Sequence, residues 1–229
     1  MAELLGRARA VAFDLDGTLV DSAPDIAAAA NGMLAQGGLP RLPQARVVAA
    51  IGDGIDALVL QVLEESAGRA PDAATVAAAG ERFRELYARD VFTASRLFPG
   101  VREGLARLAA RGLPVGCITN KARAFTARIL DRAGLASRLA FVECPESAEQ
   151  RKPAPFLLLK ACRDLGIAPG ELLYVGDSAL DVAAARAAGC PVVLVDYGYN
   201  RGRAASDSGA DAVIGSLEDL LETRAGAPR

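Results

Sequence analysis

The sequence contains no histidine. This absence excludes a Ser-His-Asp triad, a histidine-based phosphotransfer enzyme and every zinc site with an imidazole ligand. The four cysteines include no Cys-x-x-Cys pair, so the sequence indicates neither a zinc pattern nor a dense disulfide framework. Any catalysis must therefore use other acids and bases, and we expect the cysteines to be reduced and buried.

Positive charge is not in excess. Lys and Arg total 26 against 28 Asp and Glu, which gives a formal net charge of −2 at pH 7. A chain without a basic surplus is a poor partner for nucleic acid. No uninterrupted apolar run reaches the roughly 18 residues of a membrane span, and the N-terminal segment lacks the features of a signal peptide. We therefore expect a cytoplasmic protein, monomeric or homodimeric, that binds neither nucleic acid nor membranes.

What the sequence does contain is a series of six short apolar runs flanked by turn residues. They cover residues 11–13, 115–118, 139–142, 172–175, 192–195 and 212–214. From residue 100 onward, the runs alternate with stretches of helical periodicity at 101–110, 122–133, 153–165 and 179–188. Repeated alternation of strand and helix predicts a Rossmann-like α/β fold, in which a doubly wound parallel sheet carries helices on both faces.

Residues 20–98 follow a different pattern. They are rich in Ala, show no convincing alternating strand, and contain helix-like segments near 24–36, 54–67 and 72–89. We therefore predict two domains: an α/β core formed by residues 1–19 and 99–229, and an inserted helical cap domain formed by residues 20–98. A cap that leaves the sheet just beyond the first strand is well placed to act as a mobile lid.

Polar residues follow the predicted strands at the points where they end. Asp14 and Asp16 come after the first run, Thr119 after the second, and Asp177 after the fourth. Lys152 precedes the helical stretch that follows the third run. Ligands of open parallel sheets bind beyond the carboxyl ends of the strands. We therefore expect these five side chains to converge on one crevice.

Carboxylates crowded in one crevice repel one another. Each pair contributes about 4 kcal/mol of repulsion at 4 Å and an effective dielectric constant near 20, so the group must take up protons or hold a cation. Oxygen ligands without histidine or clustered thiolates suit a hard ion, and Mg²⁺ fits best because it accepts one or two carboxylates together with water and a substrate phosphate. The sequence therefore predicts a Mg²⁺ site.

Four motifs carry a resemblance to a known family. DLDGTLVDS, ITNK, RKPAP and VGDSALD occur in this order with one helical insertion, and together they resemble the four motifs of the haloacid dehalogenase (HAD) superfamily, in its phosphatase branch. The match spans nearly the whole chain. Within that branch, LFPGV and VDYGYN resemble the phosphoglycolate phosphatases. The resemblance implies a parallel-sheet core, a helical cap and hydrolysis of a small phosphorylated metabolite, most simply 2-phosphoglycolate.

The resemblance also implies roles for the converging residues. Asp14 would attack phosphorus and become an aspartyl phosphate, and Asp16 would protonate the leaving alkoxide and then activate water. Thr119 would hydrogen-bond a phosphoryl oxygen, and Lys152 would neutralise charge on the nucleophile and the transferred group. Mg²⁺ would be held by Asp14, by the main-chain carbonyl of Asp16, and by Asp177.

Further residues are assigned supporting roles. By the same resemblance, Asp181 would orient water or ligands around the metal, and backbone amides near Gly17 and Asn120 would donate to the phosphate. Arg46 is a candidate for binding a substrate carboxylate. Two interpretations stay open for the turn at Gly52 to Gly54: it directs amides toward the substrate, or it simply begins a helix.

Several alternatives remain open within the same superfamily. The chain could act on another small phosphate, such as a phosphorylated sugar or sugar acid, or be a sugar phosphomutase, which shares all four motifs. Dehalogenation is disfavoured because dehalogenases lack an acid at the position of Asp16. Phosphonate cleavage through a Schiff base is disfavoured because it needs a cap lysine, and residues 20–98 contain none.

Two alternatives come from other classes of protein. The segment IGDGIDA, residues 51–57, fits the pattern G-x-G-x-x-A, but it lies inside the helical region rather than in a strand-turn-helix unit, so a nicotinamide cofactor is not expected. A phosphoacceptor signalling domain also clusters carboxylates with Thr and Lys on a parallel sheet. Such domains carry no helical lid, and the insertion therefore favours an enzyme.

Overall fold

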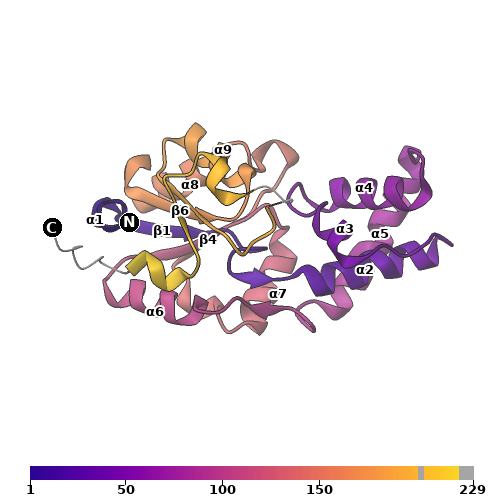
Figure 1. The fold of residues 1–229 in the computed structure, drawn as a ribbon, viewed down its shortest axis with the longest axis horizontal. Helices are drawn as coiled ribbons and strands as arrows, with labels where there is room; N and C mark the ends of the chain where they lie inside the picture. The colour runs from indigo at the N-terminus through magenta and orange to yellow at the C-terminus, as the bar shows by residue number, and fades with distance from the viewer. Residues whose placement is uncertain (201–203, 222–229) are drawn as a thin grey trace.

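The computed structural model describes residues 1–200 and 204–221, and its centre is a six-stranded parallel sheet in the order β5-β4-β1-β6-β7-β8 (Figure 1). Every adjacent pair in this sheet is parallel. The strands are β1 (Ala10–Phe13), β4 (Val115–Ile118), β5 (Phe141–Glu143), β6 (Leu172–Gly176), β7 (Val192–Val195) and β8 (Ala212–Ile214). The predicted α/β fold with a doubly wound parallel sheet is confirmed.

Alternate residues of the central strand β1 serve two separate hydrophobic cores. Val11 and Phe13 belong to one cluster, whereas Ala10 and Ala12 belong to the other, as the two-residue period of a strand requires. The first cluster includes residues of α6 (Val101–Ala110) and α7 (Arg123–Arg132), and the second includes residues of α8 (Phe156–Leu165) and α9 (Ala179–Ala188). A strand buried on both faces therefore reads as a continuous apolar run.

The third predicted strand is displaced along the chain. The sequence predicts a strand over 139–142, but residues 136–138 form a 3-10 turn and β5 begins only at Phe141. Phe141 pairs with Gly116 of β4, and a Cβ atom on that glycine would lie 2.2 Å from the Phe141 ring. The missing side chain at Gly116 therefore makes room for the aromatic ring and fits this register.

Residues 23–90, which follow the first strand of the sheet, form a group of helices at one end of the molecule (Figure 1). These helices are α2 (Ala23–Gln36), α3 (Gln44–Val48), α4 (Ile55–Ala67) and α5 (Ala73–Asp90), while α1 (Ala2–Arg7) precedes the sheet. Local signals set their ends: the Asp72 carboxylate accepts a hydrogen bond from the Thr75 amide at the start of α5, and Gly68 ends α4 with φ of 66°, as N-caps and left-handed C-caps do.

A short ribbon joins the helical group to the sheet. The chain leaves through β2 (Val20–Asp21) and returns through β3 (Arg96–Leu97), which pair antiparallel. The sequence did not predict this ribbon because two-residue strands are too short to show an alternating pattern. It lies close to the predicted junctions at residues 20 and 98, but the division into core and cap domains stays a prediction.

The Asp25 carboxylate fastens the two ends of the helical group together. Asp25 lies in the first turn of α2 and is 5% exposed. It accepts hydrogen bonds from the amides of Thr93, Ala94 and Ser95 at 2.7–3.0 Å and from the Ser95 hydroxyl at 2.5 Å. The segment that returns to the sheet is therefore held to the helix that leaves it.

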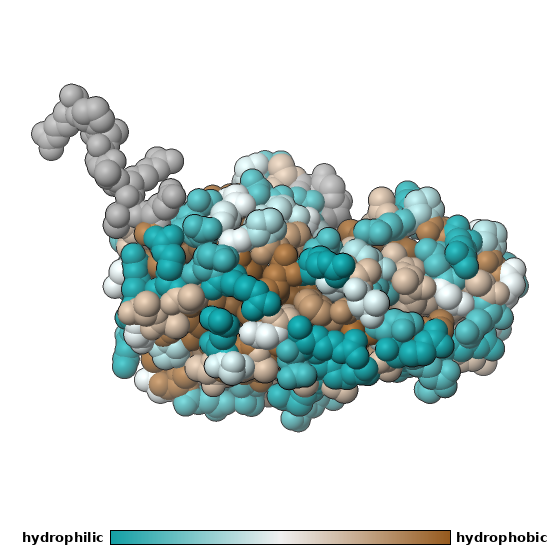
Figure 2. Space-filling model, turned by 90° about the horizontal axis from the view of Figure 1, so that it is seen from below, coloured by the Kyte–Doolittle hydropathy of each residue, from teal (hydrophilic) through white to brown (hydrophobic). Residues whose placement is uncertain are grey.

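The surface is largely hydrophilic on the face shown in Figure 2, and hydrophobic residues gather near its middle, between the sheet end and the helical end. Among the described residues, no helix combines the length and the apolar character that a membrane crossing requires.

Candidate active site

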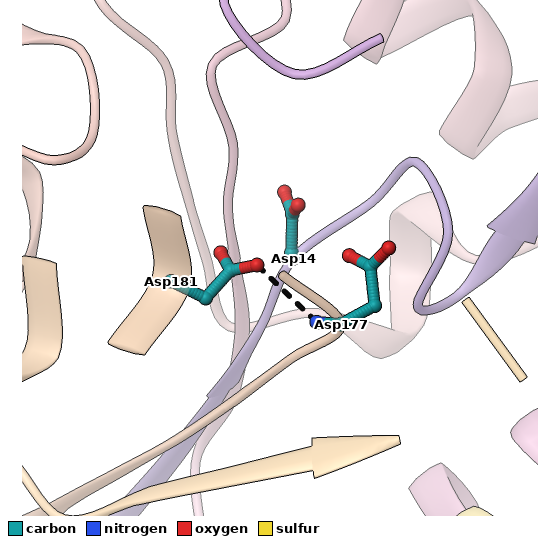
Figure 3. Close-up of side chains that lie close together, drawn as sticks. All are labelled: Asp14, Asp177 and Asp181. Atoms are coloured by element: carbon teal, nitrogen blue, oxygen red, sulfur yellow. Dashed lines mark hydrogen bonds between the residues drawn. The ribbon is translucent and has the colours of Figure 1, made fainter. Parts of the chain in front are cut away.

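Two neighbouring strands at the centre of the sheet bring predicted site residues together. Asp14 directly follows β1, Asp177 directly follows β6, and all four residues of β1 pair with β6. Asp181 lies in the first turn of α9. One carboxylate oxygen from each of the three residues lies within 4.8 Å of the others, and Figure 3 shows the side chains grouped beyond the strand ends. The strand ends thus place Asp14 and Asp177 in one site.

Two glycines allow the chain to close around Asp177. Gly17 has φ of 89°, and a Cβ atom there would lie 2.3 Å from Asp177 Oδ2. A Cβ atom on Gly198 would lie 2.2 Å from the Asp177 Cβ, so a side chain at either position would displace the aspartate. The Tyr199 amide and the Thr18 hydroxyl donate to its carboxylate at 2.5 and 3.3 Å. These contacts fix the direction of Asp177.

The surroundings of Asp177 oppose its negative charge. Burial raises the pKa of this carboxyl group well above its ordinary value, and the charges of Asp181 and Asp14 raise it further. The Tyr199 amide and Lys152 act in the opposite direction. A carboxyl group in such a place either takes up a proton or pairs with a cation.

Lys152 is buried beside the carboxylates. Hydrogen bonds hold both its main chain and its side chain. Its amide donates to Asn120 Oδ1 at 2.7 Å, and its carbonyl accepts from Asn120 Nδ2 at 3.0 Å. Its ammonium group donates to Asp181 Oδ1 at 2.6 Å and to the Tyr174 hydroxyl at 2.9 Å. Burial alone would lower the pKa of Lys152, but Asp14 and Asp181 raise it, so the net shift is upward and the group stays cationic.

Asp181 holds the ammonium group of Lys152 in place, and both of its own carboxylate oxygens accept hydrogen bonds. Its Oδ1 accepts from Lys152 and from the Tyr174 hydroxyl, the latter at 3.1 Å. Its Oδ2 accepts from the Ser178 amide, the Ser178 hydroxyl and the Asp177 amide at 3.0, 2.7 and 3.2 Å. Burial acts to raise the pKa of Asp181, but Lys152 and Ser178 lower it overall. Both oxygens are therefore occupied by protein donors.

The carboxylate of Asp14 accepts fewer hydrogen bonds than that of Asp181. Lys152 Nζ lies 3.0 Å from its Oδ1, yet this buried oxygen has no hydrogen-bond partner among the described residues; the contact is an ion pair without the angles of a hydrogen bond. Burial raises the pKa of Asp14 to about 6 against the opposing charge of Lys152, and Asp181 and Asp16 add to the rise. Asp14 is thus a buried carboxyl group with an oxygen available to a ligand.

Asp16 is held from two other segments. The Ser22 hydroxyl donates to its Oδ1 at 2.5 Å, and Lys121 Nζ lies 3.0 Å from both Oδ1 and Oδ2. Burial would lower the pKa of Lys121, but Asp16 raises it, and the net shift is upward. Lys121 therefore stays cationic and lies directly beside the carboxyl group of Asp16.

A cavity of about 570 Å³ opens over these residues. From the sheet end it is lined by side chains that include Asp14, Asp16, Thr119, Asn120 and Asp177, and from the helical end by Ile51, Ile55, Leu58, Phe83 and Tyr87. The Asn120 side chain bridges the two ends by donating to the Gly52 carbonyl at 2.9 Å. The IGDG turn, with Gly52 and Gly54 in the lining, therefore faces the site.

Arg46 is not brought to this cavity. It lies on α3 with its side chain 63% exposed, pairs with Glu65 of α4, and is absent from the described lining. The sequence could not show this because the direction of a side chain on a short helix depends on how the helix packs.

The family is decided by comparison with known proteins. A model of the haloacid dehalogenase-like hydrolase family matches residues 8–189, which is most of the chain. The chain belongs to this family. The HAD fold resemblance stated from the four motifs is confirmed, and the carboxylates at the ends of β1 and β6 are those of the first and fourth motifs.

Individual HAD-family proteins match over almost their whole length. The chain is 44% identical over 219 residues to phosphoglycolate phosphatase of Thiobacillus denitrificans, covering 95% of this chain and 96% of that one. It is 46% identical over 213 residues to phosphoglycolate phosphatase of Yersinia pseudotuberculosis, covering 93% and 91%. A crystal structure of a predicted phosphoglycolate phosphatase from Haemophilus somnus superposes with a TM-score of 0.89 at 32% identity, covering 94% and 97%.

Some contacts of this HAD site escaped the sequence-based prediction. Lys121 lies in the ITNK motif, and nothing in the sequence indicates that it pairs with Asp16. Tyr174 supports Lys152 from inside β6 and reads in the sequence as an ordinary strand residue. Tyr199 lies in the segment VDYGYN. Its partner Asp177 lies 22 residues earlier, and neither spacing nor periodicity links the two positions.

Proposed function

We propose that the protein is a Mg²⁺-dependent phosphomonoester hydrolase that releases phosphate from 2-phosphoglycolate through an aspartyl-phosphate intermediate. The observation that carries this proposal is the meeting of Asp14, Lys152 and Asp177 beyond two adjacent central strands, with Asp16 beside them in the same cavity. The names of the similar proteins support the choice of substrate. We place the enzyme in the cytoplasm, and the substrate is its small-molecule partner.

The first half-reaction transfers the phosphoryl group to Asp14. A carboxylate oxygen of Asp14 bonds to phosphorus as the bond from phosphorus to the ester oxygen breaks, and Asp16 gives its proton to that oxygen so that glycolate leaves. The ammonium group of Lys152, 3.0 Å from Asp14 Oδ1, balances charge on the nucleophile and the transferred group. The Thr119 hydroxyl and amides near Gly17 and Asn120 supply donors for the phosphoryl oxygens.

The second half-reaction regenerates the enzyme. Asp16, now a carboxylate, takes a proton from water, the water oxygen bonds to phosphorus, and the bond to Asp14 breaks to release inorganic phosphate. Asp16 therefore ends protonated, ready for another cycle. Ser22 and Lys121 hold its carboxylate in place.

The residues present fit a hard divalent cation. An oxygen of Asp14 lacks a hydrogen-bond partner among the described residues, burial opposes the charge of Asp177, and the available donors are oxygens, as Mg²⁺ prefers. Asp14, Asp177 and the main-chain carbonyl of Asp16 would hold it, while Asp181 orients its neighbours. When bound, Mg²⁺ reduces the repulsion between the anionic nucleophile and the anionic phosphate.

A panel of phosphate esters tests the proposal. Phosphoglycolate, hexose phosphates and muramic acid phosphate are each incubated with Mg²⁺, and released inorganic phosphate is measured. We expect the highest kcat/KM for phosphoglycolate. Preference for a sugar phosphate would change the substrate, conversion of one sugar phosphate into another would indicate a mutase, and stable phosphorylation of the protein without phosphate release would indicate a signalling domain.

A further inference from the structure

Three cationic side chains line the cavity within the described part of the chain: Arg84, Lys121 and Arg151. Arg84 is paired with Asp56, and the Arg84 side chain is 39% exposed. Arg151 is directed at the turn before α4, with Nη1 3.5 Å from the Asp53 carbonyl. Lys121 differs from both because its side chain is only 8% exposed and its charge lies beside Asp16.

One donor of the Lys121 ammonium group has no carboxylate acceptor among the described residues. A lysine ammonium group carries three N–H donors, and in Lys121 two of them are matched by the two carboxylate oxygens of Asp16 at 3.0 Å. On its other side the nitrogen lies 4.8 Å from the ring centroid of Tyr87. The third donor has the Tyr87 hydroxyl oxygen near it, which contributes to the raised pKa of Lys121, so this buried cation in the cavity has no anionic acceptor beyond Asp16 among the described residues.

Tyr87 adds a hydroxyl donor at the same place. It belongs to α5, is 2% exposed and lines the cavity. Its hydroxyl oxygen is buried with no hydrogen-bond partner among the described residues. Leaving a buried polar group unpaired costs about 1–3 kcal/mol. Burial also raises the pKa of Tyr87, so the hydroxyl keeps its proton.

The Tyr87 ring is fixed by aromatic neighbours, so the hydroxyl is held in position. Its centroid lies 5.7 Å from that of Phe83 on the same helix and 5.1 Å from that of Phe125 on α7. An ammonium group from the sheet end and a phenol from the helical end therefore face one space. Among the described residues, the Tyr87 hydroxyl proton has no acceptor and Lys121 has no anionic partner beyond Asp16, and together they predict an anionic oxygen ligand.

We propose that Lys121 and Tyr87 bind the carboxylate of the substrate. This inference rests on the proposed function, in which Asp16 protonates the ester oxygen. In 2-phosphoglycolate the carboxylate carbon is two bonds from that oxygen, so a substrate placed for proton transfer carries its carboxylate close to the cation that contacts Asp16. Lys121 thereby takes the role for which the sequence suggested Arg46, which lies outside the lining.

The enzyme should therefore prefer phosphate esters that carry a carboxylate. A site with a buried cation and a buried hydroxyl strongly rejects analogues that lack the matching acceptor. An ester without a carboxylate leaves the Tyr87 hydroxyl proton without an acceptor and Lys121 without a second anionic partner. The carboxylate of an acidic substrate also joins the helical group to the sheet end, because each contributes one donor.

The test compares 2-phosphoglycolate with ethyl phosphate, which keeps the O–C–C skeleton but has no carboxylate. The variants are Lys121→Met and Tyr87→Phe, and the matched control is Arg84→Met, which removes a cavity cation already paired with Asp56. The quantity measured is kcat/KM for phosphoglycolate divided by kcat/KM for ethyl phosphate. The ratio cancels effects on Asp16, because both esters use the same acid.

We expect Lys121→Met to lower this ratio at least about 30-fold, as loss of a buried charge partner does, and Tyr87→Phe to lower it about tenfold, as loss of a hydrogen bond to a charged group does. Arg84→Met should leave the ratio within about twofold. Tyr87→Phe keeps the aromatic packing, so it remains informative even if Lys121→Met fails to fold.

Equal losses for both esters in the Lys121 and Tyr87 variants would overturn the carboxylate subsite while leaving the proposed hydrolase intact. Collapse of the ratio in Arg84→Met, with the other two unchanged, would move the carboxylate to Arg84. A wild-type enzyme with no preference for phosphoglycolate would instead overturn the proposed substrate and this inference together.

Discussion

The cavity has two walls of different construction: the sheet wall, which includes Asp14, Thr119 and Asp177, and the helical wall, which includes Phe83 and Tyr87. On the sheet wall, most polar groups contact one another: Lys152 contacts Asp14 and Asp181, and Asp177 is held by two donors, although Asp14 Oδ1 has no hydrogen-bond partner among the described residues. On the helical wall, the lining is mainly apolar, and the hydroxyl of Tyr87 has no acceptor for its proton among the described residues. The sheet wall is therefore preorganised for the reaction, whereas the helical wall keeps a hydroxyl donor for the ligand.

The largest effect is expected at the nucleophile on the sheet wall. Asp14→Asn removes the attacking carboxylate while keeping the shape of the side chain, so kcat should fall at least about ten thousandfold. Phosphate release from phosphoglycolate measures the loss, and circular dichroism checks that the fold is kept. A variant with full turnover would falsify the role of Asp14.

Removal of the metal tests the same wall, because Asp14 and Asp177 would bind the ion. EDTA should abolish phosphate release and added Mg²⁺ should restore it. In a measurement that does not depend on activity, Mg²⁺ at 100 times its Kd should raise the unfolding free energy by about 2.7 kcal/mol. Asp177→Asn should remove most of this gain, whereas Asp164→Asn, on the exposed part of α8, should retain it. Equal stabilisation of both variants would contradict the metal assignment.

The sheet wall was largely predictable from sequence because its residues follow apolar runs. Asp14, Thr119 and Asp177 each come just after a strand, and the carboxyl ends of parallel strands share one edge. The helical wall was not predictable in this way. Tyr87 lies on a helix with several possible faces, and its relation to Lys121 depends on how α5 packs near the end of β4.

Contacts between distant segments account for the other differences. Asp25 reads as an ordinary acidic residue in the first turn of a helix, which the helix dipole favours, yet its partners lie 68 to 70 residues later. Arg46 was chosen for its charge, but on the folded α3 that charge is paired with Glu65. Sequence indicates which chemistry is available, whereas packing decides which side chains reach the site.

A smaller loss of kcat is expected when a residue that orients the catalytic groups is changed, rather than a catalytic group itself. Asp181→Asn keeps one oxygen acceptor for Ser178 but replaces the charged oxygen that accepts from Lys152 by an amide NH₂ group. We expect kcat to fall about 10- to 100-fold, as for other supporting residues of charged sites, with KM changed less. A loss as large as that of Asp14→Asn would mean that Asp181 takes part in the reaction itself.

The smallest effect on chemistry, but a clear one on stability, is expected at Asp25, which holds the two ends of the helical group together. Asp25→Ala leaves three buried or part-buried amides without their acceptor and should lower the unfolding free energy by about 2–3 kcal/mol at pH 7. Urea unfolding measures this. Asp90→Ala, whose exposed carboxylate pairs only with Arg89 among the described residues, is the control and should change stability by less than about 0.5 kcal/mol.

The contribution of Asp25 should also depend on pH with a defined sign. Burial acts to raise its pKa, but hydrogen bonds from Ser95, Ala94 and Thr93 lower it overall below the ordinary value. A carboxyl group whose pKa is lower in the folded state stabilises fully above its unfolded pKa of about 3.9 and loses that contribution as pH falls through the folded value. The difference between wild type and Asp25→Ala should therefore be constant near neutral pH and shrink in acid. A difference that grows on acidification would show that the hydrogen bonds do not favour the carboxylate form, and the junction would then be held by packing alone.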